Sequence, residues 1–391
     1  MISGRKAKGF IRWGDSMFKY RKKTRSYRLV ANAIGSLFPG LVKPRRVVDD
    51  RDSLNDAAPV VLIWPSGIPK PLVGLVRDTD DKPYWTKYER FLKHNQIPFE
   101  YYNIHASTWR TAAERFDAVV WRPGSEPVEL FEARKKIYLL ERYLRKSCYP
   151  SFDTVMTYED KILQYELLKH YGFPVIDTFI SHDYDEIARQ TGVMAYPAVS
   201  KVSPGSGSFG VEIVENAGQA DRIAGAAFAF AGRQTYWPYL NQKNYVFFQQ
   251  YQKNEGYDLR IIVIGAIIIG YYRDVPAGDF RASGMGLVRW GELPADAVEL
   301  ARRIARRFDS VAIAVDMLRD PDTGKLAVIE LSSFTRVDGD EGQRDGVLGI
   351  HILDEDGALS FQEGKYWLQE LALREFFARV WLKQPLPPPG K

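Results

Sequence analysis

Residues 257–269 read YDLRIIVIGAIII, which is the pattern of two apolar strands joined by a Gly265-Ala266 turn. A second pair of apolar runs follows, Val311–Asp316 and Leu326–Ser332, around the turn 320–324 (DPDTG). Each run has the length of a strand and is rich in β-branched residues, which favours buried strands over helices. Residues 257–335 are therefore predicted to form the structural centre of the chain.

Two acidic residues stand at or near the ends of the second pair of strands, Asp316 and Glu330. If the strands are antiparallel neighbours, the turn brings the two carboxylates together. Two close carboxylates are suited to a hard cation such as magnesium. The alternative is that both are strand-end acids facing water.

A lysine and a glycine-rich loop lie upstream of this centre. Lys201 ends an apolar run, Ala198–Val202, and the next residues read SPGSGSFG, with glycines at 205, 207 and 210. Glycines let backbone amides approach phosphate oxygens closely, and the ammonium group neutralises their charge. The spacing is not that of a P-loop, and such a loop taken alone is also compatible with an ordinary turn.

The segment 58–150 alternates strands with helices. Strands are predicted at Val60–Trp64, Phe99–Asn103 and Asp117–Arg122, and helices at Lys82–Asn95 and Val128–Lys146. This alternation predicts a small α/β lobe with a parallel sheet. No Gly-x-Gly-x-x-Gly follows the first strand, so no dinucleotide site is predicted there.

A helix is predicted to begin at the string Thr157-Tyr158-Glu159-Asp160, interpreted as a capping box in which Thr157 and Asp160 satisfy free amides. Lys161 then lies in the first helical turn, where the helix dipole favours anions.

Charge is distributed unevenly along the 391 residues. Residues 1–46 contain thirteen Lys or Arg and one Asp, interleaved with Phe10, Trp13, Phe18, Tyr20 and Tyr27. This basic arm is either a solvated or self-docked decoration, or it binds an anionic membrane surface, an acidic partner or nucleic acid. The single cysteine, Cys148, fits a reducing compartment, and no apolar run reaches about 18 residues. We expect a cytoplasmic protein and leave peripheral membrane association through the arm open.

Taken together, the order of these motifs resembles the ATP-grasp superfamily, closest to the branch of ribosomal-protein glutamate ligase. The resemblance runs from about Ser151 to Thr335 and more loosely over the preceding lobe. It is carried by Asp160-Lys161, the run from Pro197 to Lys201 with its glycine loop, Gln249-Gln250-Tyr251, Asp258-Leu259-Arg260, Arg273, Phe280-Arg281, Val315-Asp316 and Glu330-Leu331-Ser332.

The resemblance implies two α+β lobes that clasp ATP, preceded by the small parallel lobe. The implied domains are an arm and linker (1–57), the preceding lobe (58–150), an N-terminal ATP-grasp lobe (151–252) and a C-terminal lobe (253–391).

The resemblance also assigns roles to individual residues. Those expected to bind ATP are Lys161 and Lys201 at the phosphates, Gly205, Ser206, Gly207 and Gly210 in the loop that closes over them, Gln250, Tyr251 and Gln252 at the adenine, and Asp258. Those expected to hold magnesium are Asp316, Glu330, which would bridge two ions, and Ser332. Those expected to steady the transferred phosphate are Arg260, Arg273 and Arg281.

The chain departs from the family pattern at two positions, each two residues after a functional one. The family usually has Asn where this chain has Ser332, and commonly has Asn where it has Ser283. A hydroxyl is a weaker neutral ligand than an amide carbonyl, which weakens the case for a second magnesium ion.

The implied reaction is ATP-dependent joining of a carboxylate to an amine through an acyl phosphate. The carboxylate could belong to an amino acid, a peptide or a glycan. Two alternatives remain, a phosphotransferase that acts on a hydroxyl, and a non-catalytic ATP-binding scaffold.

Overall fold

The computed structural model describes residues 46–54, 57–205, 210–235, 237, 239–276, 278, 281–282, 285–334, 337, 346–354 and 358–383. The basic arm up to residue 45, Ser206, Gly207 and Ser283 lie outside these residues. Among the helices that are described, none is both long enough and apolar enough to cross a membrane.

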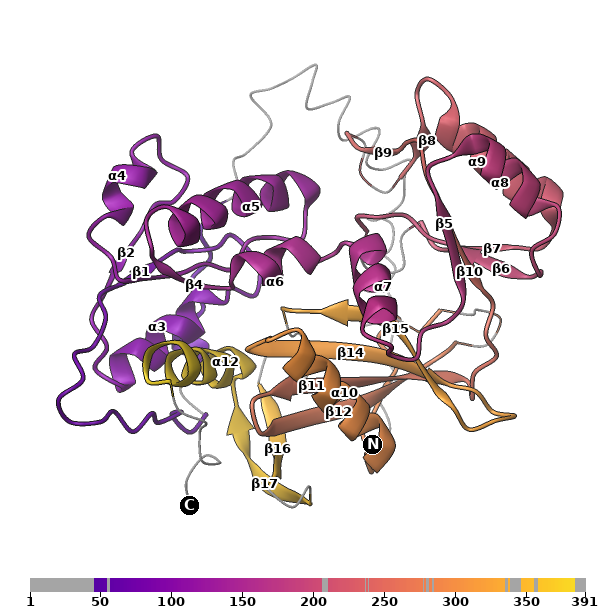
Figure 1. Ribbon diagram of the computed structural model, residues 1–391. Helices are drawn as coiled ribbons and strands as arrows, with labels where there is room; N and C mark the ends of the chain where they lie inside the picture. The colour runs from indigo at the N-terminus through magenta and orange to yellow at the C-terminus, as the bar shows by residue number, and fades with distance from the viewer. Residues whose placement is uncertain are drawn as a thin grey trace, which may run out of the picture.

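The first sheet is parallel and has the strand order β2-β1-β3-β4. Helix α3 lies on one face and α5 on the other, as Figure 1 shows at the indigo end of the chain. The elements of this lobe are β1 (Val73–Leu75), α3 (Trp85–His94), β2 (Phe99–Tyr101), α4 (Trp109–Ala113), β3 (Ala118–Val120), α5 (Pro127–Arg142) and β4 (Ser147–Tyr149), preceded by a 3-10 turn at Arg51–Ser53.

The predicted first strand, Val60–Trp64, is wrong, because the first strand of the sheet is β1 at Val73–Leu75. Residues 60–62 bond to a side chain rather than to a strand. The Asn95 amide nitrogen donates to the Val60 carbonyl, and the Leu62 N–H donates to Asn95 Oδ1. A short apolar run in the sequence looks the same whether its backbone pairs with a strand or bonds to a side chain.

The second sheet is antiparallel, with the order β5-β10-β6-β7, and α8 and α9 cover it. Its elements and those leading into it are α6 (Phe152–Thr157), α7 (Lys161–His170), β5 (Thr178–Ser181), α8 (Tyr184–Thr191), β6 (Ala198–Ser200), β7 (Glu212–Val214), α9 (Ala217–Phe228), a small hairpin of β8 (Arg233–Gln234) and β9 (Asn241–Gln242), and β10 (Val246–Gln250).

The third sheet is the antiparallel centre predicted from residues 257–335. Its order is β15-β14-β11-β12-β16-β17, with β13 paired to β12. Its elements are β11 (Tyr257–Ile264), β12 (Ile267–Asp274), β13 (Val288–Arg289), α10 (Ala295–Arg307), β14 (Ala312–Arg319), β15 (Leu326–Ser332), β16 (Val347–Leu353), β17 (Leu359–Tyr366) and α12 (Leu368–Phe376), which continues into a π-helical turn, Phe377–Trp381.

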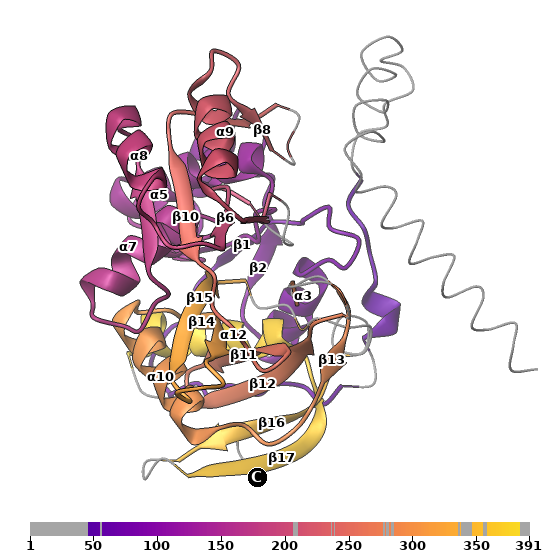
Figure 2. The ribbon, with the colours of Figure 1, turned by 90° about the vertical axis from the view of Figure 1, so that its right-hand side faces the viewer.

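The two faces of this third sheet have different partners. Alternate residues Ile261 and Val263 pack under α10, whereas Ile262 and Ile264 share a core with α12, α3 and the parallel sheet. Helix α12 therefore joins the first lobe to the third sheet, and Figures 1 and 2 show it lying between them. The second sheet projects away from this body, and a cavity lies between it and the third sheet.

Candidate active site

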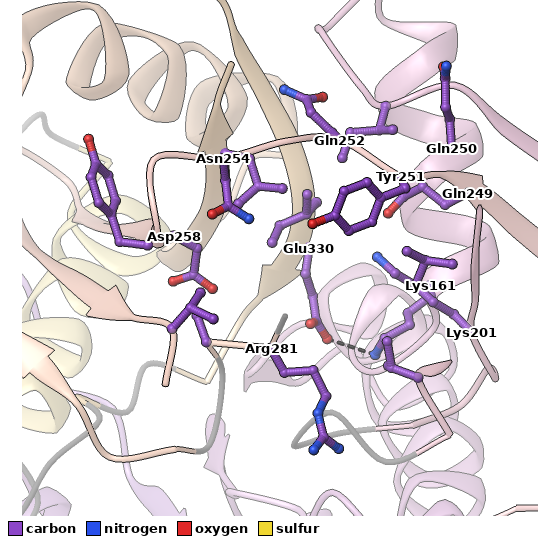
Figure 3. A pocket seen from close by; sticks show the side chains of 18 of the residues that line it. Lys161, Lys201, Gln249, Gln250, Tyr251, Gln252, Asn254, Asp258, Arg281 and Glu330 are labelled. Atoms are coloured by element: carbon purple, nitrogen blue, oxygen red, sulfur yellow. Dashed lines mark hydrogen bonds and ion pairs between the residues drawn. The ribbon is translucent and has the colours of Figure 1, made fainter. Parts of the chain in front are cut away.

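The cavity between the second and third sheets collects most of the residues predicted to bind ATP (Figure 3). Its lining comes from α7, from the ends of β6, β10 and β15, and from the start of β11. The predicted residues that line it are Lys161, Lys201, Gly205, Gln250, Tyr251, Gln252, Asp258, Arg281 and Glu330. Side chains up to 169 positions apart in the chain are thus brought into direct contact here.

Lys161 is the first residue of α7, and its buried ammonium group reaches into the cavity. It donates to Glu330 Oε1 at 2.8 Å and also to the Gly205 carbonyl. Burial opposes the charge of this ammonium, but Glu330 and Glu159 hold its pKa above the ordinary value. Lys161 therefore stays charged and links the glycine loop to the third sheet.

The capping box predicted at Thr157–Asp160 is wrong in its register. Thr157 ends the short helix α6, and Asp160 itself is the N-cap of α7, where its Oδ1 accepts from the Leu163 N–H at 3.1 Å. The sequence pattern correctly predicts that a helix starts here. It does not show whether Asp160 is the N-cap or the third residue after it, because an acid is common at both positions.

Lys201 follows β6 and lies on the same side of the cavity as Lys161 (Figure 3). Burial and the neighbouring Lys161 lower the pKa of Lys201 to about 8, although Glu330 acts in the opposite direction. Two ammonium groups this close repel each other in the absence of an anion, so the pair is suited to a polyphosphate.

The described ends of the glycine loop are held in fixed geometry. Gly210 has φ +72°, and a Cβ there would lie 2.5 Å from Val202, so only glycine fits. At the other end, the Ser203 N–H donates to the Tyr245 hydroxyl, which in turn donates to the Ser203 carbonyl. The loop thus begins and ends at constrained points beside the cavity.

The segment Gln250–Gln252 connects the two sheets and forms one wall of the cavity. Its backbone is fixed because the Gln250 N–H donates to the Asp177 carbonyl and the Tyr251 N–H to the Pro197 carbonyl. Apolar side chains line the adjoining surface, contributed by Ile176, Val199, Leu318 and Ile329. A polar connecting segment beside apolar walls is suited to a flat, heteroaromatic base.

A row of charged residues crosses the third sheet beside this cavity. Arg260 on β11 binds Asp316 on β14 with two parallel contacts, Nε to Oδ1 at 2.6 Å and Nη2 to Oδ2 at 2.7 Å. Arg273 on β12 reaches Asp316 Oδ2 at 2.8 Å and binds Asp258 through Nε and Nη2 at 2.6 and 2.9 Å. We call these four residues the arginine–aspartate row.

Three of the four residues in the arginine–aspartate row are almost fully buried. Arg273 and Asp316 are each 2 % exposed, and Asp258 is 3 % exposed. Burial opposes ionisation of Asp316, but Arg260 and Arg273 hold its pKa well below the usual range. Burial raises the pKa of Asp258 to about 6 despite its contact with Arg273. Arg260 and Arg273, which the sequence predicts to bind phosphate, thus contact protein carboxylates in this structure.

Glu330 is the residue here that best fits a magnesium ligand. It is the Cα partner of Asp316, as the predicted strand pairing requires, and its side chain is 28 % exposed. Asp316 would first have to give up a guanidinium contact, and the Ser332 hydroxyl donates to the Phe334 carbonyl at 3.2 Å. Among the described residues, no three His, Cys, Asp or Glu side chains are grouped as a metal site. Magnesium commonly uses one or two carboxylates and completes its shell with phosphate oxygens and water.

Two functional candidates escaped the sequence reasoning. Gln164 Nε2 donates to the carbonyls of Leu331 and Thr157, and its Oε1 accepts from the Leu331 N–H, so its amide fixes α7 against β15. A polar residue on the buried face of the predicted helix was the available signal. The second residue is Glu159, which is buried in the turn before α7 and has φ +60°. Nothing in the sequence marks its environment.

The chain is similar to known proteins in sequence. The model of the RimK-like ATP-grasp domain family matches residues 158–354, half of the chain. A curated relative, the glutamate–LysW ligase ArgX of Sulfurisphaera tokodaii, is 23 % identical over 257 residues, which cover 63 % of this chain and 85 % of the relative.

Two solved structures are also similar to part of the chain. A RimK-domain ATP-grasp protein from Sphaerobacter thermophilus has a TM-score of 0.41 at 19 % identity, with 55 % of this chain and 72 % of the other covered. A D-alanine–D-alanine ligase from Bacillus anthracis has a TM-score of 0.47 at 15 % identity, with 69 % and 88 % covered.

Proposed function

The chain belongs to the RimK-like ATP-grasp family, and we propose that it is a ligase that joins a substrate carboxylate to an amine with cleavage of ATP to ADP and phosphate. The family confirms the resemblance and the fold class inferred from the sequence. The observation that carries the proposal is the cavity itself, in which two lysines, the end of the glycine loop, the Gln250–Gln252 wall and Glu330 meet.

Different residues are assigned to different parts of ATP. We assign the polyphosphate to Lys161 and Lys201, and the adenine to the Gln250–Gln252 wall and its apolar neighbours. Glu330 would hold magnesium, which supplies charge neutralisation at the phosphates when it is bound. Arg281 also lines the cavity, and we assign it the contact with the transferred phosphate.

The proposed reaction has two steps. A carboxylate oxygen bonds to the γ-phosphorus of ATP while the bond to the β–γ bridging oxygen breaks, and ADP leaves. The amine nitrogen then bonds to the acyl carbon, the bond from that carbon to phosphate breaks, and the nitrogen loses one proton. No side chain forms a covalent bond to substrate in these steps. The side chains position the reactants and stabilise negative charge.

Within the arginine–aspartate row, only Asp258 also lines the cavity. We propose that the other three residues support this site rather than contact substrate. The contacts within the row fix β11, β12 and β14 in register behind Glu330. We therefore assign Arg260 and Arg273 a positioning role, and propose that the direct phosphate contact expected of them belongs to Arg281.

We take an amino-acid carboxylate as the first substrate class to test. The curated relative is named for ligation of glutamate, which makes L-glutamate the natural first compound, with peptides and uronic acids next. The test incubates the full chain with ATP, magnesium and each carboxylate, and uses hydroxylamine as a small, uncharged nucleophile that converts an acyl phosphate into a hydroxamate.

The expected result is carboxylate-dependent ADP release with an equal amount of hydroxamate and free phosphate. A reaction without carboxylate measures background ATP hydrolysis. If no carboxylate in the panel gives hydroxamate, and phosphate is instead recovered as an ester of a hydroxyl compound, the protein is a phosphotransferase and the proposal fails.

The basic arm is proposed separately to bind polyanions. The local charge of residues 1–46 motivates this, and the arm precedes every described element of the catalytic lobes. Deletion of residues 1–46 should leave hydroxamate formation unchanged and weaken sedimentation with anionic vesicles in a salt-dependent way. Equal sedimentation of both forms, together with a lower melting temperature for the truncated one, would show that the arm docks on its own protein instead.

A further inference from the structure

Glu159 combines two unfavourable features at one position. It lies just after the end of α6 with φ +60°, a left-handed backbone conformation that favours glycine over residues with side chains. Its side chain is also buried, at 9 % exposure, and its Oε2 has no hydrogen-bond partner among the residues that the structure describes. A buried carboxylate oxygen without a partner is a substantial further cost.

The groups around Glu159 belong to the proposed reaction centre. Lys161, two residues on, and Glu330 both interact with it electrostatically. The Lys161 ammonium, however, is bound to Glu330 Oε1 and to the Gly205 carbonyl. Glu159 therefore adds a second carboxylate beside the Lys161–Glu330 pair.

Arg122 approaches Glu159 from the parallel lobe. It lies two residues after β3, at the carboxyl edge of the parallel sheet, where α/β proteins commonly bind ligands. Its guanidinium lies 3.5 Å from Asp80 Oδ2 and over the rings of Tyr84 and Phe334. Because Arg122 also interacts electrostatically with Glu159, the Glu159 carboxylate lies at the junction of the parallel lobe and the ATP cavity.

A structural role does not account for these features. A glycine would relieve the backbone at this position, and a polar or apolar side chain would avoid a buried, unpartnered carboxylate. Burial raises the pKa of the Glu159 carboxyl to about 7, so its ionised form gains strongly from a cationic ligand. Unfavourable backbone and burial at one residue beside a reaction centre are typical of functional positions.

We propose that Glu159 binds the amino group of the acceptor, so that the amine enters from the parallel-lobe side of Glu330 and its N–H groups donate to Glu159 Oε2. This inference rests on the proposed ligase function and adds the place of the amine to it. It also specifies the substrate class, a primary amine that is an ammonium ion in solution. Lys161, Arg122 and Arg260 offset the burial of this carboxylate only in part, and an uncharged hydroxyl would add no further positive charge.

The experiment measures competition between methylammonium chloride and hydroxylamine in the hydroxamate reaction, with L-glutamate or whichever carboxylate the first screen identifies. Methylammonium should inhibit the unmodified protein by occupying the Glu159 site. Tetramethylammonium, which has the charge but no N–H, should inhibit much less, and potassium chloride at equal ionic strength controls for screening. Glu159→Gln should raise the methylammonium concentration for half inhibition at least about tenfold, as expected for loss of a charge-assisted hydrogen bond.

Two variants separate this role from a folding effect. Glu159→Gly should weaken inhibition as strongly while leaving the melting temperature equal or higher, because glycine suits φ +60°. Glu141→Gln is the matched control, since burial likewise raises the pKa of Glu141 to about 7, but its carboxylate accepts from the Phe152 N–H, away from the Lys161–Glu330 pair. Methylammonium should inhibit this variant as it inhibits the unmodified protein.

Several outcomes overturn the inference without touching the proposed function. One is hydroxamate formation that methylammonium does not inhibit in the unmodified protein. Another is a Glu159→Gln variant with unchanged inhibition. A third is a variant whose main change is a higher magnesium requirement, which would make Glu159 a metal ligand. Absence of hydroxamate with every carboxylate would instead refute the ligase function itself.

Discussion

Asp316 and Glu330 are direct Cα partners on neighbouring strands, yet their surroundings differ completely. Asp316 is 2 % exposed and both its oxygens accept from arginines, whereas the Glu330 side chain is 28 % exposed and reaches into the ATP cavity. The two carboxylates that the sequence suggests as one metal pair therefore belong to two layers. One layer is the buried arginine–aspartate row, of which only Asp258 also lines the cavity, and the other is the rest of the cavity lining.

This difference in surroundings suggests that the buried layer mainly stabilises the fold and that the cavity lining mainly binds ligand. In the buried layer each charge is compensated by protein, so removing one partner leaves another buried and unpaired. In the cavity lining, Lys161 is paired with Glu330, whereas protein carboxylates offset the burial of the Lys201 charge only in part, which suits Lys201 to an incoming anion. Substitutions in the two layers should consequently differ in whether they lower stability or binding.

The largest effect is expected in the buried layer. Asp316→Asn removes the negative charge that Arg260 and Arg273 share, and should lower the free energy of unfolding by about 3–5 kcal/mol, measured by urea denaturation. The matched control is Asp296→Asn, which breaks a similar two-contact pair with Arg319 at the surface and should cost at most about 1 kcal/mol. Similar losses in both variants would remove the distinction between the layers.

Glu330→Gln should have the opposite profile. The introduced amide would keep an oxygen near Lys161 but would lose the negative charge needed to hold magnesium. We expect turnover in the hydroxamate assay to fall by about 100-fold or more, while the melting temperature changes far less than in Asp316→Asn. Near-normal turnover at low magnesium would show that Glu330 is only an acid at the end of a strand.

Lys201 provides a smaller effect with a characteristic pH dependence. Lys201→Ala should weaken binding of a non-hydrolysable ATP analogue by about 2 kcal/mol, since a phosphate contact is lost. In the unmodified protein, burial lowers the pKa of Lys201 to about 8, so the free protein loses this charge as the pH rises through 8. Affinity should therefore be constant below pH 8 and decline by up to about tenfold per pH unit above it.

Lys201→Arg tests the cause of that decline. A guanidinium stays charged throughout this pH range, so affinity in this variant should no longer fall above pH 8. A decline that persists unchanged in Lys201→Arg would assign the titration to another group and would remove Lys201 from the phosphate site.

The sequence predicted the strands of the third sheet and the proximity of Asp316 and Glu330, because strand length, turn and alternation are local properties. It did not predict that Arg260 would take both oxygens of Asp316, because that contact depends on the pairing of β11 with β14, and the two residues are separated by 56 positions. The interaction of Glu159 with Arg122 is equally inaccessible, since it joins separate lobes. The local sequence pattern was enough to predict the site. Which charged side chains face the cavity depends on how distant strands and lobes pack together.

The smallest expected effect concerns Ser332, which is two residues from Glu330 on the same strand. Its hydroxyl donates to the Phe334 carbonyl, so it is engaged with its own backbone in this structure. If the site nevertheless uses this position for a second magnesium ion, Ser332→Asn should lower the magnesium concentration for half activity by a few-fold, because an amide carbonyl is the better ligand.

Ser332→Ala completes this test because it removes the hydroxyl without offering a new ligand. If the hydroxyl contacts a cation during turnover, this variant should raise the magnesium concentration for half activity, opposite to Ser332→Asn. If its only role is the contact with Phe334, neither variant should shift the magnesium dependence. Glu330 would then be the sole residue of β15 that holds magnesium, and the boundary between the cavity lining and the supporting structure would lie within two residues of one strand.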